Sequence, residues 1–116
     1  MFVADRGNGR IQIFDQDGRF LDAWPQFGEA TGIYIDRNGL LYAAGPGSSD
    51  STEGGGRGIR IGSVRDGRVM SFIPDSGAPA TGVGGVVGVA VDGRGNVFGA
   101  SVNPEIPPRA LMKYVR

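Results

Sequence analysis

Apolar residues occur along the chain in short runs, and within these runs they often alternate with polar residues, as in Arg10-Ile11-Gln12-Ile13-Phe14. Such alternation indicates β-strands with one buried face, and the Val, Ile, Phe and Tyr content of the runs is typical of strands. We expect ten strands, at residues 2–4, 11–14, 20–24, 32–36, 40–44, 59–63, 69–73, 87–92, 96–100 and 110–115.

Several connections between neighbouring runs contain strong turn signals. Asp17-Gly18, Asn38-Gly39 and Asp66-Gly67 are dipeptides of the kind that form primed two-residue turns, because these turns need positive φ angles. Strands joined by such turns pair antiparallel. The sequence therefore predicts consecutive hairpins, which together make β-meanders.

The strand pattern repeats along the chain. Residues 32–44 match residues 88–100 in their apolar spacing, 56 positions later. Residues 10–21 resemble residues 58–70, at an offset of 48 or 49 positions. These interleaved matches give repeating units of four short strands in a fixed order.

The units divide the chain into three parts. Residues 28–78 hold a complete unit with a Gly- and Ser-rich insertion at 45–57. Residues 1–27 lack the first strand of the unit, and residues 79–116 lack the fourth. Four-stranded antiparallel units at a spacing of about 40 to 50 residues are typical of β-propeller blades. We expect an all-β fragment holding about two and a half blades of a propeller, and the alternative is a small self-contained β-sheet protein.

The composition limits the fold classes and the kinds of catalytic and metal sites that the chain can form. Of 116 residues, 22 are Gly and 7 are Pro, which disfavours long helices, while 40% are apolar, enough for one modest core. There is no Cys and no His, so thiolate zinc sites and histidine general bases are excluded and zinc is not supported by this chain.

The charge balance and the hydropathy of the sequence indicate which classes of partner are unfavoured. The 12 basic and 12 acidic residues give no net charge, which makes nucleic acid an unfavoured partner. No stretch approaches the length of a membrane span, and the start of the chain lacks the pattern of a signal peptide.

The run V-A-D-R-G-N-G-R-I-Q-I-F-D-Q-D-G at residues 3–18 resembles the NHL repeat, whose pattern is V-A-D-x-x-N-x-R-I-Q-V-F-D-x-x-G. Residues 32–44 and 88–100 are similar to the companion part of that repeat, G-I-A-V-D-x-x-G-N-V-Y-V-A-D. The resemblance implies a six-bladed propeller, as found in bacterial exported proteins, gluconolactonase-like enzymes, peptidyl-hydroxyglycine amidating lyases and animal RNA-binding proteins. Residues 57–63, 72–75 and 108–114 look most similar to the bacterial amidating-lyase-like proteins, which implies a periplasmic or extracellular location.

Asp5 and Arg10 occupy the Asp and Arg positions of the repeat, at a turn between two strands. A structural role is favoured, in which the carboxylate accepts turn hydrogens and the Arg stem packs on the sheet. The alternative is that this turn lines a mouth of the ring and contacts a protein or small-molecule partner.

Asp36 and Asp92 end equivalent strands of adjacent units. Their carboxylates are candidates for holding a hard cation such as calcium in a shared channel. The favoured alternative is that each begins an Asx-type turn.

The Gly-rich segments and the aromatic residues each have a structural and a functional interpretation. The Gly-rich segments at 45–57 and 82–88 are better explained as a surface insertion and a linker than as phosphate cradles, because no Walker or dinucleotide pattern is present. Phe20, Trp24, Phe27 and Tyr34 are better explained as packing residues than as base-stacking residues.

Together these features predict a fragment of a propeller that acts as a ligand- or protein-binding scaffold without a complete active site. The alternative is part of a metal-dependent enzyme of the lyase or lactonase type, so the enzymatic status of the parent protein stays open. Unpaired strand edges predict contact with the remaining blades of such a parent, or self-association.

Overall fold

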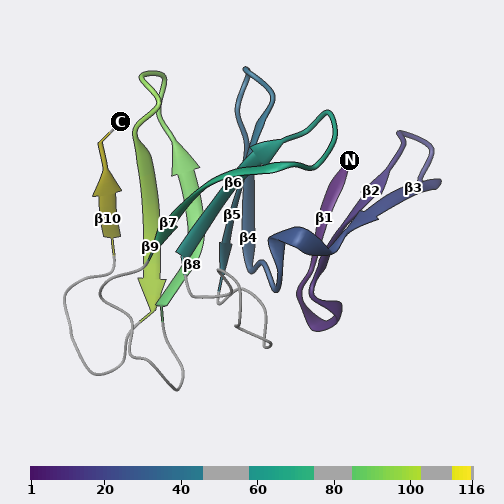
Figure 1. The fold of residues 1–116 in the computed structure, drawn as a ribbon, viewed down its shortest axis with the longest axis horizontal. Helices are drawn as coiled ribbons and strands as arrows, with labels where there is room; N and C mark the ends of the chain where they lie inside the picture. Colours follow the sequence, from purple (N-terminus) through teal and green to yellow (C-terminus); the bar gives the residue numbers. More distant parts are fainter. Residues whose placement is uncertain (46–57, 75–84, 103–110, 116) are drawn as a thin grey trace.

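The computed structural model describes residues 1–45, 58–74, 85–102 and 111–115, and this part of the chain is all-β (Figure 1). Its ten strands are β1 (Phe2–Asp5), β2 (Arg10–Phe14), β3 (Phe20–Trp24), β4 (Gly32–Ile35), β5 (Leu40–Gly45), β6 (Gly58–Ser63), β7 (Val69–Pro74), β8 (Gly85–Val91), β9 (Val97–Val102) and β10 (Leu111–Tyr114). Two short 3-10 helices, η1 (Arg6–Asn8) and η2 (Pro25–Phe27), connect β1 to β2 and β3 to β4. Across these ranges no helix is long and apolar enough to cross a membrane.

The strands form three small antiparallel sheets, which confirms the predicted meanders. The first sheet has the order β1-β2-β3, the second β4-β5-β6-β7, and the third β10-β9-β8. Each expected strand is present, with ends that differ by at most two residues. The three sheets do not close into a ring within the described ranges. The insertion at 46–57 and the start of the Gly-rich segment, 82–84, lie outside the described residues.

The hairpin turns are of a different type from the one that the sequence predicts. Asn38 and Asp66 do not have the positive φ that a primed turn requires, since every positive φ in the described chain belongs to Gly. In the β4–β5 turn, Gly39 N–H donates to the Asp36 carbonyl and Asp36 N–H donates to the Leu40 carbonyl. Gly39, with φ of 80°, then supplies the left-handed residue of a three-residue hairpin loop.

The two central strands of the second sheet, β5 and β6, are buried on both faces. Along β5, Leu41 and Ala43 belong to one buried cluster, which includes Trp24 of the first sheet. Tyr42 and Ala44 point to the opposite face and belong to a second cluster, which includes Val97 of the third sheet. Successive strand residues point to opposite faces, so this one strand contributes to both interfaces.

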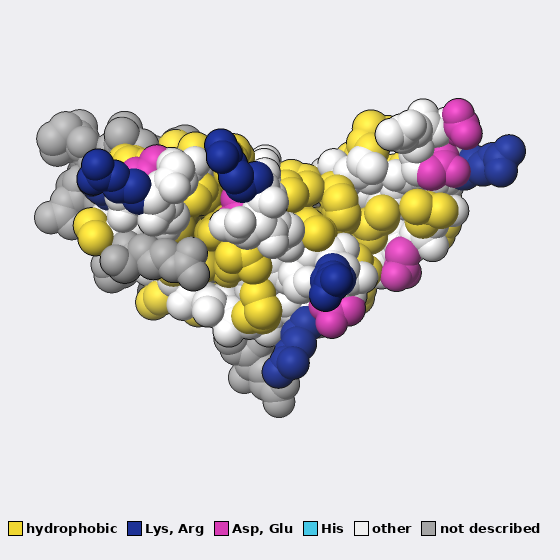
Figure 2. Space-filling model, turned by 90° about the horizontal axis from the view of Figure 1, so that it is seen from above, with side chains coloured by type: hydrophobic (Ala, Val, Ile, Leu, Met, Phe, Trp, Pro, Cys, Tyr) yellow, Lys and Arg dark blue, Asp and Glu magenta, His cyan; other side chains and the backbone are white. Residues whose placement is uncertain are grey.

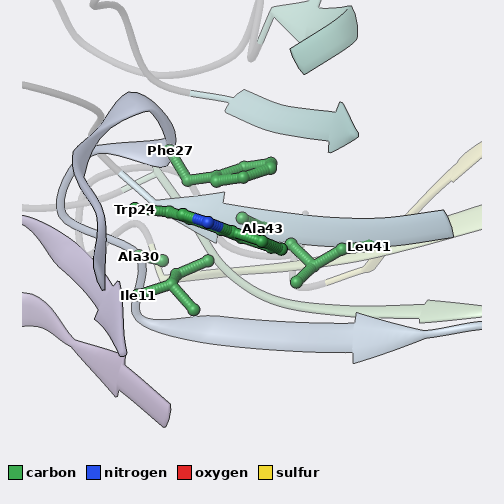
Figure 3. Packing of buried hydrophobic residues seen from close by; sticks show 6 residues of the cluster. All are labelled: Ile11, Trp24, Phe27, Ala30, Leu41 and Ala43. Atoms are coloured by element: carbon green, nitrogen blue, oxygen red, sulfur yellow. The ribbon is translucent and has the colours of Figure 1, made fainter. Parts of the chain in front are cut away.

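The interface between the first and second sheets is centred on aromatic residues (Figure 3). Trp24 at the end of β3 and Phe27 in η2 lie with ring centroids 6.2 Å apart, next to Ile11 of β2. A Cβ atom added at Gly62 would lie 2.6 Å from the Phe27 ring, so glycine is required for the sheets to approach this closely. The Gln26 side-chain amide adds a polar link by donating to the Gly67 carbonyl at 2.7 Å.

Candidate functional site

The β4–β5 and β8–β9 turns project from the same end of the molecule (Figure 1). Between them lies a cavity of about 270 Å³. The residues that line it are Tyr34, Asp36, Arg37, Asn38, Val91, Asp92, Gly93, Arg94 and Gly95. The structure therefore brings Asp36 and Asp92 to one cavity, as the equivalence of their units suggests.

The carboxylate of Asp36 holds its own turn together. Its Oδ1 accepts hydrogen bonds from the backbone N–H groups of Asn38 and Leu40, both at 2.9 Å. Its Oδ2 accepts a hydrogen bond from the Tyr42 hydroxyl at 3.2 Å. These bonds form an Asx-type turn, the favoured prediction for Asp36, extended by one contact to the neighbouring strand.

Asp92 repeats this arrangement in the third sheet. Its Oδ1 accepts from the backbone N–H groups of Arg94 and Asn96, both at 2.9 Å, and its Oδ2 accepts from the Asn96 side-chain amide at 2.9 Å. The Asn96 hydrogen bonds, first that of the side chain, lower the pKa of Asp92 below its usual value of 3.8, and nearby Lys113 adds a smaller effect.

A third copy of the motif lies outside the cavity. Asp15, at the β2–β3 turn, accepts from the backbone N–H groups of Asp17 and Arg19 through Oδ1, both at 2.9 Å. Its turn carries the same pair of backbone hydrogen bonds and ends in Gly18 with φ of 83°. The sequence signal is Asp-x-x-Gly, which is part of both repeat patterns and occurs at residues 15–18, 36–39 and 92–95. This recurrence shows that the motif closes hairpins.

The calcium prediction can be compared with these hydrogen bonds. Carboxylate oxygens are suitable calcium ligands, but calcium takes six to eight oxygen ligands, and Asp36 and Asp92 each already accept three hydrogen bonds. Among the described residues no group of three or more acidic, His or Cys residues could hold a metal ion. The residues present thus form an incomplete coordination shell, and the calcium site stays a prediction.

Two guanidinium groups at the cavity remain available. Arg37 and Arg94 are exposed, and neither forms an ion pair with a carboxylate in the described ranges. The acidic residues beside them are occupied by their own turns. The charged groups that are free to bind a ligand are therefore the guanidiniums of Arg37 and Arg94 rather than the two carboxylates. The sequence did not indicate this role for the two arginines.

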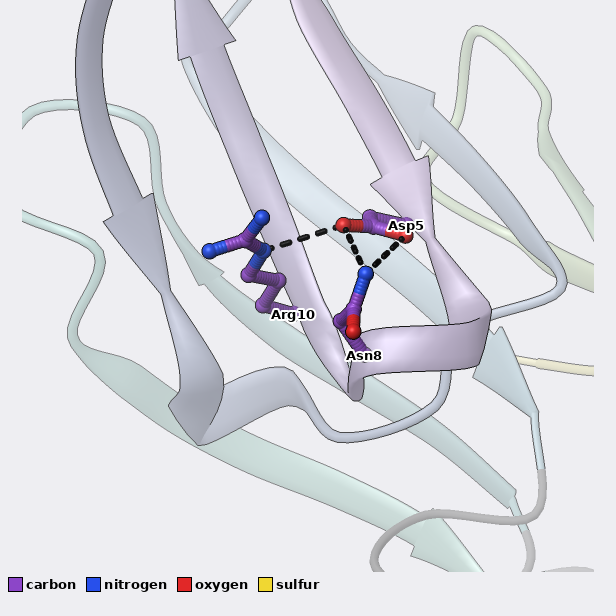
Figure 4. A network of polar contacts seen from close by, with 3 residues as sticks. All are labelled: Asp5, Asn8 and Arg10. Atoms are coloured by element: carbon purple, nitrogen blue, oxygen red, sulfur yellow. Dashed lines mark hydrogen bonds and ion pairs between the residues drawn. The ribbon is translucent and has the colours of Figure 1, made fainter.

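Asp5 and Arg10 lie at the opposite end of the molecule, at the β1–β2 turn (Figures 1 and 4). The Asp5 Oδ2 accepts from Arg10 Nε at 3.0 Å and from the Asn8 side-chain amide at 3.0 Å, and that amide also reaches Oδ1 at 3.2 Å. The hydrogen bonds from Asn8 and then Arg10 lower the pKa of Asp5 below 3.8. Both residues contact each other within the turn, and the donors to Asp5 are the side chains of Asn8 and Arg10 rather than the turn amides of the favoured interpretation.

The aromatic residues divide between the core and the surface. Trp24 and Phe27 are buried in the first interface and cannot stack on a base. Phe20 and Tyr34 are partly exposed, at 56% and 37%. On the face that carries the turns, basic and acidic side chains are interspersed, and no stripe of one sign is seen there (Figure 2).

Arg60 is the buried charged residue of the described chain. It is 6% exposed on β6, and its guanidinium lies 4.7 Å from the centroid of the Phe72 ring. Burial lowers the pKa of Arg60 because desolvation disfavours the charged form. Stacking on Phe72 offsets part of that cost.

Comparison with known proteins adds no identification to this geometry. No protein-family model matches the chain, and a comparison of its sequence with curated proteins also found no match.

Proposed function

We propose that the chain is an arc of a six-bladed β-propeller of the NHL type and that it serves as a binding scaffold. The observation that carries this proposal is the centre of the second sheet, which is buried on both faces between neighbours built on the same meander. Sheets that stack face to face in this way are the building principle of propellers. The likeness of residues 3–18 to the NHL repeat supports the same assignment.

The cavity between the β4–β5 and β8–β9 turns is the ligand contact of this scaffold. Its available charged groups are the guanidiniums of Arg37 and Arg94, since Asp36 and Asp92 are occupied by hydrogen bonds within their turns. Guanidinium groups bind carboxylates and phosphates through paired N–H donors. The ligand class that fits is a small anion, or an acidic side chain of a partner protein.

A titration followed by amide NMR tests this function. Inorganic phosphate is added to the isotope-labelled chain in a phosphate-free buffer, and calcium chloride is added in a separate series. We expect phosphate to cause saturable shifts in the amide signals of residues 37–39 and 93–95. We expect these shifts to disappear in a variant carrying Arg37→Gln and Arg94→Gln.

The matched control is Arg19→Gln. Arg19 follows the third Asp-x-x-Gly turn, which does not line the cavity, so this variant should respond to phosphate as the unmodified chain does. Saturable shifts with calcium instead would favour the cation prediction for Asp36 and Asp92. A chain that responds to neither ion would contradict a binding role for this cavity.

A further inference from the structure

The chain contains two Asn-Gly pairs, Asn8-Gly9 and Asn38-Gly39, and each lies between two paired strands. In such a pair the backbone nitrogen of Gly attacks the side-chain carbonyl carbon of Asn, since glycine has no side chain to hinder the approach. A C–N bond forms, the side-chain nitrogen leaves as ammonia with the proton of the Gly N–H, and a cyclic imide results. Water then opens the imide to aspartate or isoaspartate, so that one amide becomes one carboxylate.

At the first pair the structure constrains both reacting groups (Figure 4). The side-chain nitrogen of Asn8 donates to the two carboxylate oxygens of Asp5, at 3.0 and 3.2 Å. The N–H of Gly9, which supplies the attacking nitrogen, donates to the Arg6 carbonyl at 2.9 Å. These hydrogen bonds have to break before the imide forms, and those to a charged carboxylate are the stronger kind.

At the second pair the same groups are less constrained. Asn38 is exposed, and its side-chain amide has no hydrogen-bond partner among the residues that the structure describes. The Gly39 N–H donates to the Asp36 carbonyl at 3.3 Å, which is longer than an ordinary N–H···O hydrogen bond. The Asp36 carboxylate binds the backbone N–H groups of Asn38 and Leu40, and neither of these takes part in the reaction.

The second pair also lies in the candidate site. Asn38 lines the cavity between the two turns together with Arg37 and Arg94. A carboxylate at position 38 would add a negative charge beside the two guanidinium groups. It would compete with an anionic ligand for them.

From these differences we propose that Asn38-Gly39 is a site of spontaneous deamidation, whereas Asn8-Gly9 is protected by Asp5. The modification replaces a neutral amide of the cavity with a carboxylate and thereby weakens anion binding. The choice of Asn38 over Asn8 goes beyond the proposed function. The effect on anion binding rests on that function.

The site selectivity is tested on the full chain, incubated in a mildly alkaline buffer made with oxygen-18 water. Proteolytic digestion and mass spectrometry then measure deamidation at each Asn, because the new carboxyl oxygen comes from the labelled water. Synthetic peptides of residues 6–11 and 36–41 give the rate of each pair without the fold. Relative to its own peptide, Asn38 should react at least about tenfold faster than Asn8, since hydrogen bonds to a charged group protect Asn8. Equal relative rates, or a faster reaction at Asn8, would overturn the proposal.

Two variants of the first turn separate the protection of Asn8 from other effects. Asp5→Ala removes the acceptor of the Asn8 side chain, so the rate at Asn8 should rise toward that of its peptide while the rate at Asn38 stays unchanged. Arg10→Gln breaks the ion pair but keeps the contact between Asp5 and Asn8, so Asn8 should remain protected. Circular dichroism checks that both variants fold, and the comparison of the two sites in the unmodified chain does not depend on them. An Asn8 that stays protected in folded Asp5→Ala would contradict the role given to Asp5.

The effect on anion binding is measured by the phosphate titration. Asn38→Asp introduces the carboxylate directly and should weaken phosphate binding about two- to fivefold, the contribution of one exposed ion pair. The unmodified chain should lose affinity in the same direction as it deamidates. Asn38→Ser has no side-chain carbonyl to attack, so its phosphate affinity should not change during incubation.

The two proposals fail in different ways. If the fresh chain binds phosphate and Asn38→Asp binds it equally well, the effect assigned to the modification is wrong. If the fresh chain does not bind phosphate, the proposed function is contradicted together with this effect. The mass measurement still decides the selectivity for Asn38 in either case.

Discussion

The carboxylate of Asp5 shows how much of a local site is set by neighbours along the chain. Its two partners, Asn8 and Arg10, follow three and five residues later, across the short helix η1. Both donate hydrogen bonds to the ionised carboxylate, which lowers the pKa of Asp5. The Asp and Arg were recognisable in the sequence as a turn pair, and Asn8 belongs to the same D-x-x-N-x-R pattern.

The lowered pKa gives a prediction about acid stability. A carboxyl group with a folded pKa below its unfolded value of 3.8 stabilises the protein above that pH and loses this contribution as the pH falls toward the folded pKa. We expect Asp5→Asn to lower the free energy of unfolding at neutral pH, and we expect the difference from the unmodified chain to shrink below about pH 4. Urea denaturation at a series of pH values measures this.

The matched variant for this prediction is Arg10→Gln, which removes one donor but keeps Asp5. It should reduce the pH dependence without abolishing it, since Asn8 remains the first cause of the shift. A difference between Asp5→Asn and the unmodified chain that is constant from neutral to acidic pH would contradict the assignment.

At the scale of the elements, the Asp-x-x-Gly turn is the recurring unit. The Asp carboxylate binds the turn amides, and the Gly supplies the positive φ at which the loop rejoins the next strand. The β6–β7 turn is one residue longer: Ser63 takes the place of the Asp, its hydroxyl accepts from the Arg65 N–H at 3.1 Å, and the Gly with positive φ, Gly67, follows four residues later. Each hairpin of the fold that has this turn is thus fixed by residues within the turn itself.

This role predicts the effect of removing one carboxylate. Asp36→Ala deletes three accepted hydrogen bonds, so we expect the free energy of unfolding to fall by about 1–2 kcal/mol. Asp36→Asn keeps an acceptor oxygen and should restore most of the loss. Arg37→Ala, at an exposed position of the same turn, is the control and should change the stability by less than about 0.5 kcal/mol.

The three variants are compared by thermal or urea unfolding monitored by circular dichroism. If Asp36→Ala proved as stable as Arg37→Ala, the carboxylate would be dispensable for the turn. The location of Asp36 at the cavity would then be the better explanation for an acidic residue at this position.

The strands and their pairing could be predicted from the sequence because alternation and Gly-containing turns are local signals. The turn type could not, because Asn38-Gly39 also suits a primed turn and the choice depends on where the Asp36 carboxylate binds. The cavity was predictable only through the equivalence of Asp36 and Asp92. Arg37 and Arg94 follow their Asp residues by one and two positions, so they leave no repeated signal.

At the scale of the whole molecule, the sheets are held by the two buried clusters on opposite faces of the second sheet. The alternation of apolar and polar residues indicates which residues face a core. It does not indicate which neighbouring sheet each residue contacts. The first interface depends on Gly62, whose missing side chain leaves room for the Phe27 ring. This dependence involves residues 35 positions apart in the chain and so escapes a local reading of the sequence.

Gly62→Ala tests how closely the sheets must approach. The added Cβ atom would lie 2.6 Å from both the Phe27 ring and the Arg68 carbonyl oxygen, so we expect a loss of about 1–3 kcal/mol in the free energy of unfolding. Gly7→Ala is the control, because nothing lies within 4 Å of a Cβ atom there and its φ is not positive. Equal stability of the two variants would show that the sheets can move apart without cost.

The burial of both faces of β5 affects how the hairpin finds its register. In a strand with one solvent-exposed face, a register slip of one residue is unfavourable because apolar side chains become exposed to water. Here Leu41 and Ala43 would trade places with Tyr42 and Ala44, and every one of these side chains would still be out of water. The slipped hairpin is therefore disfavoured by side-chain size, because an aromatic ring would take the place of a leucine. It is also disfavoured because the slip would break the hydrogen bond from the Tyr42 hydroxyl to Asp36.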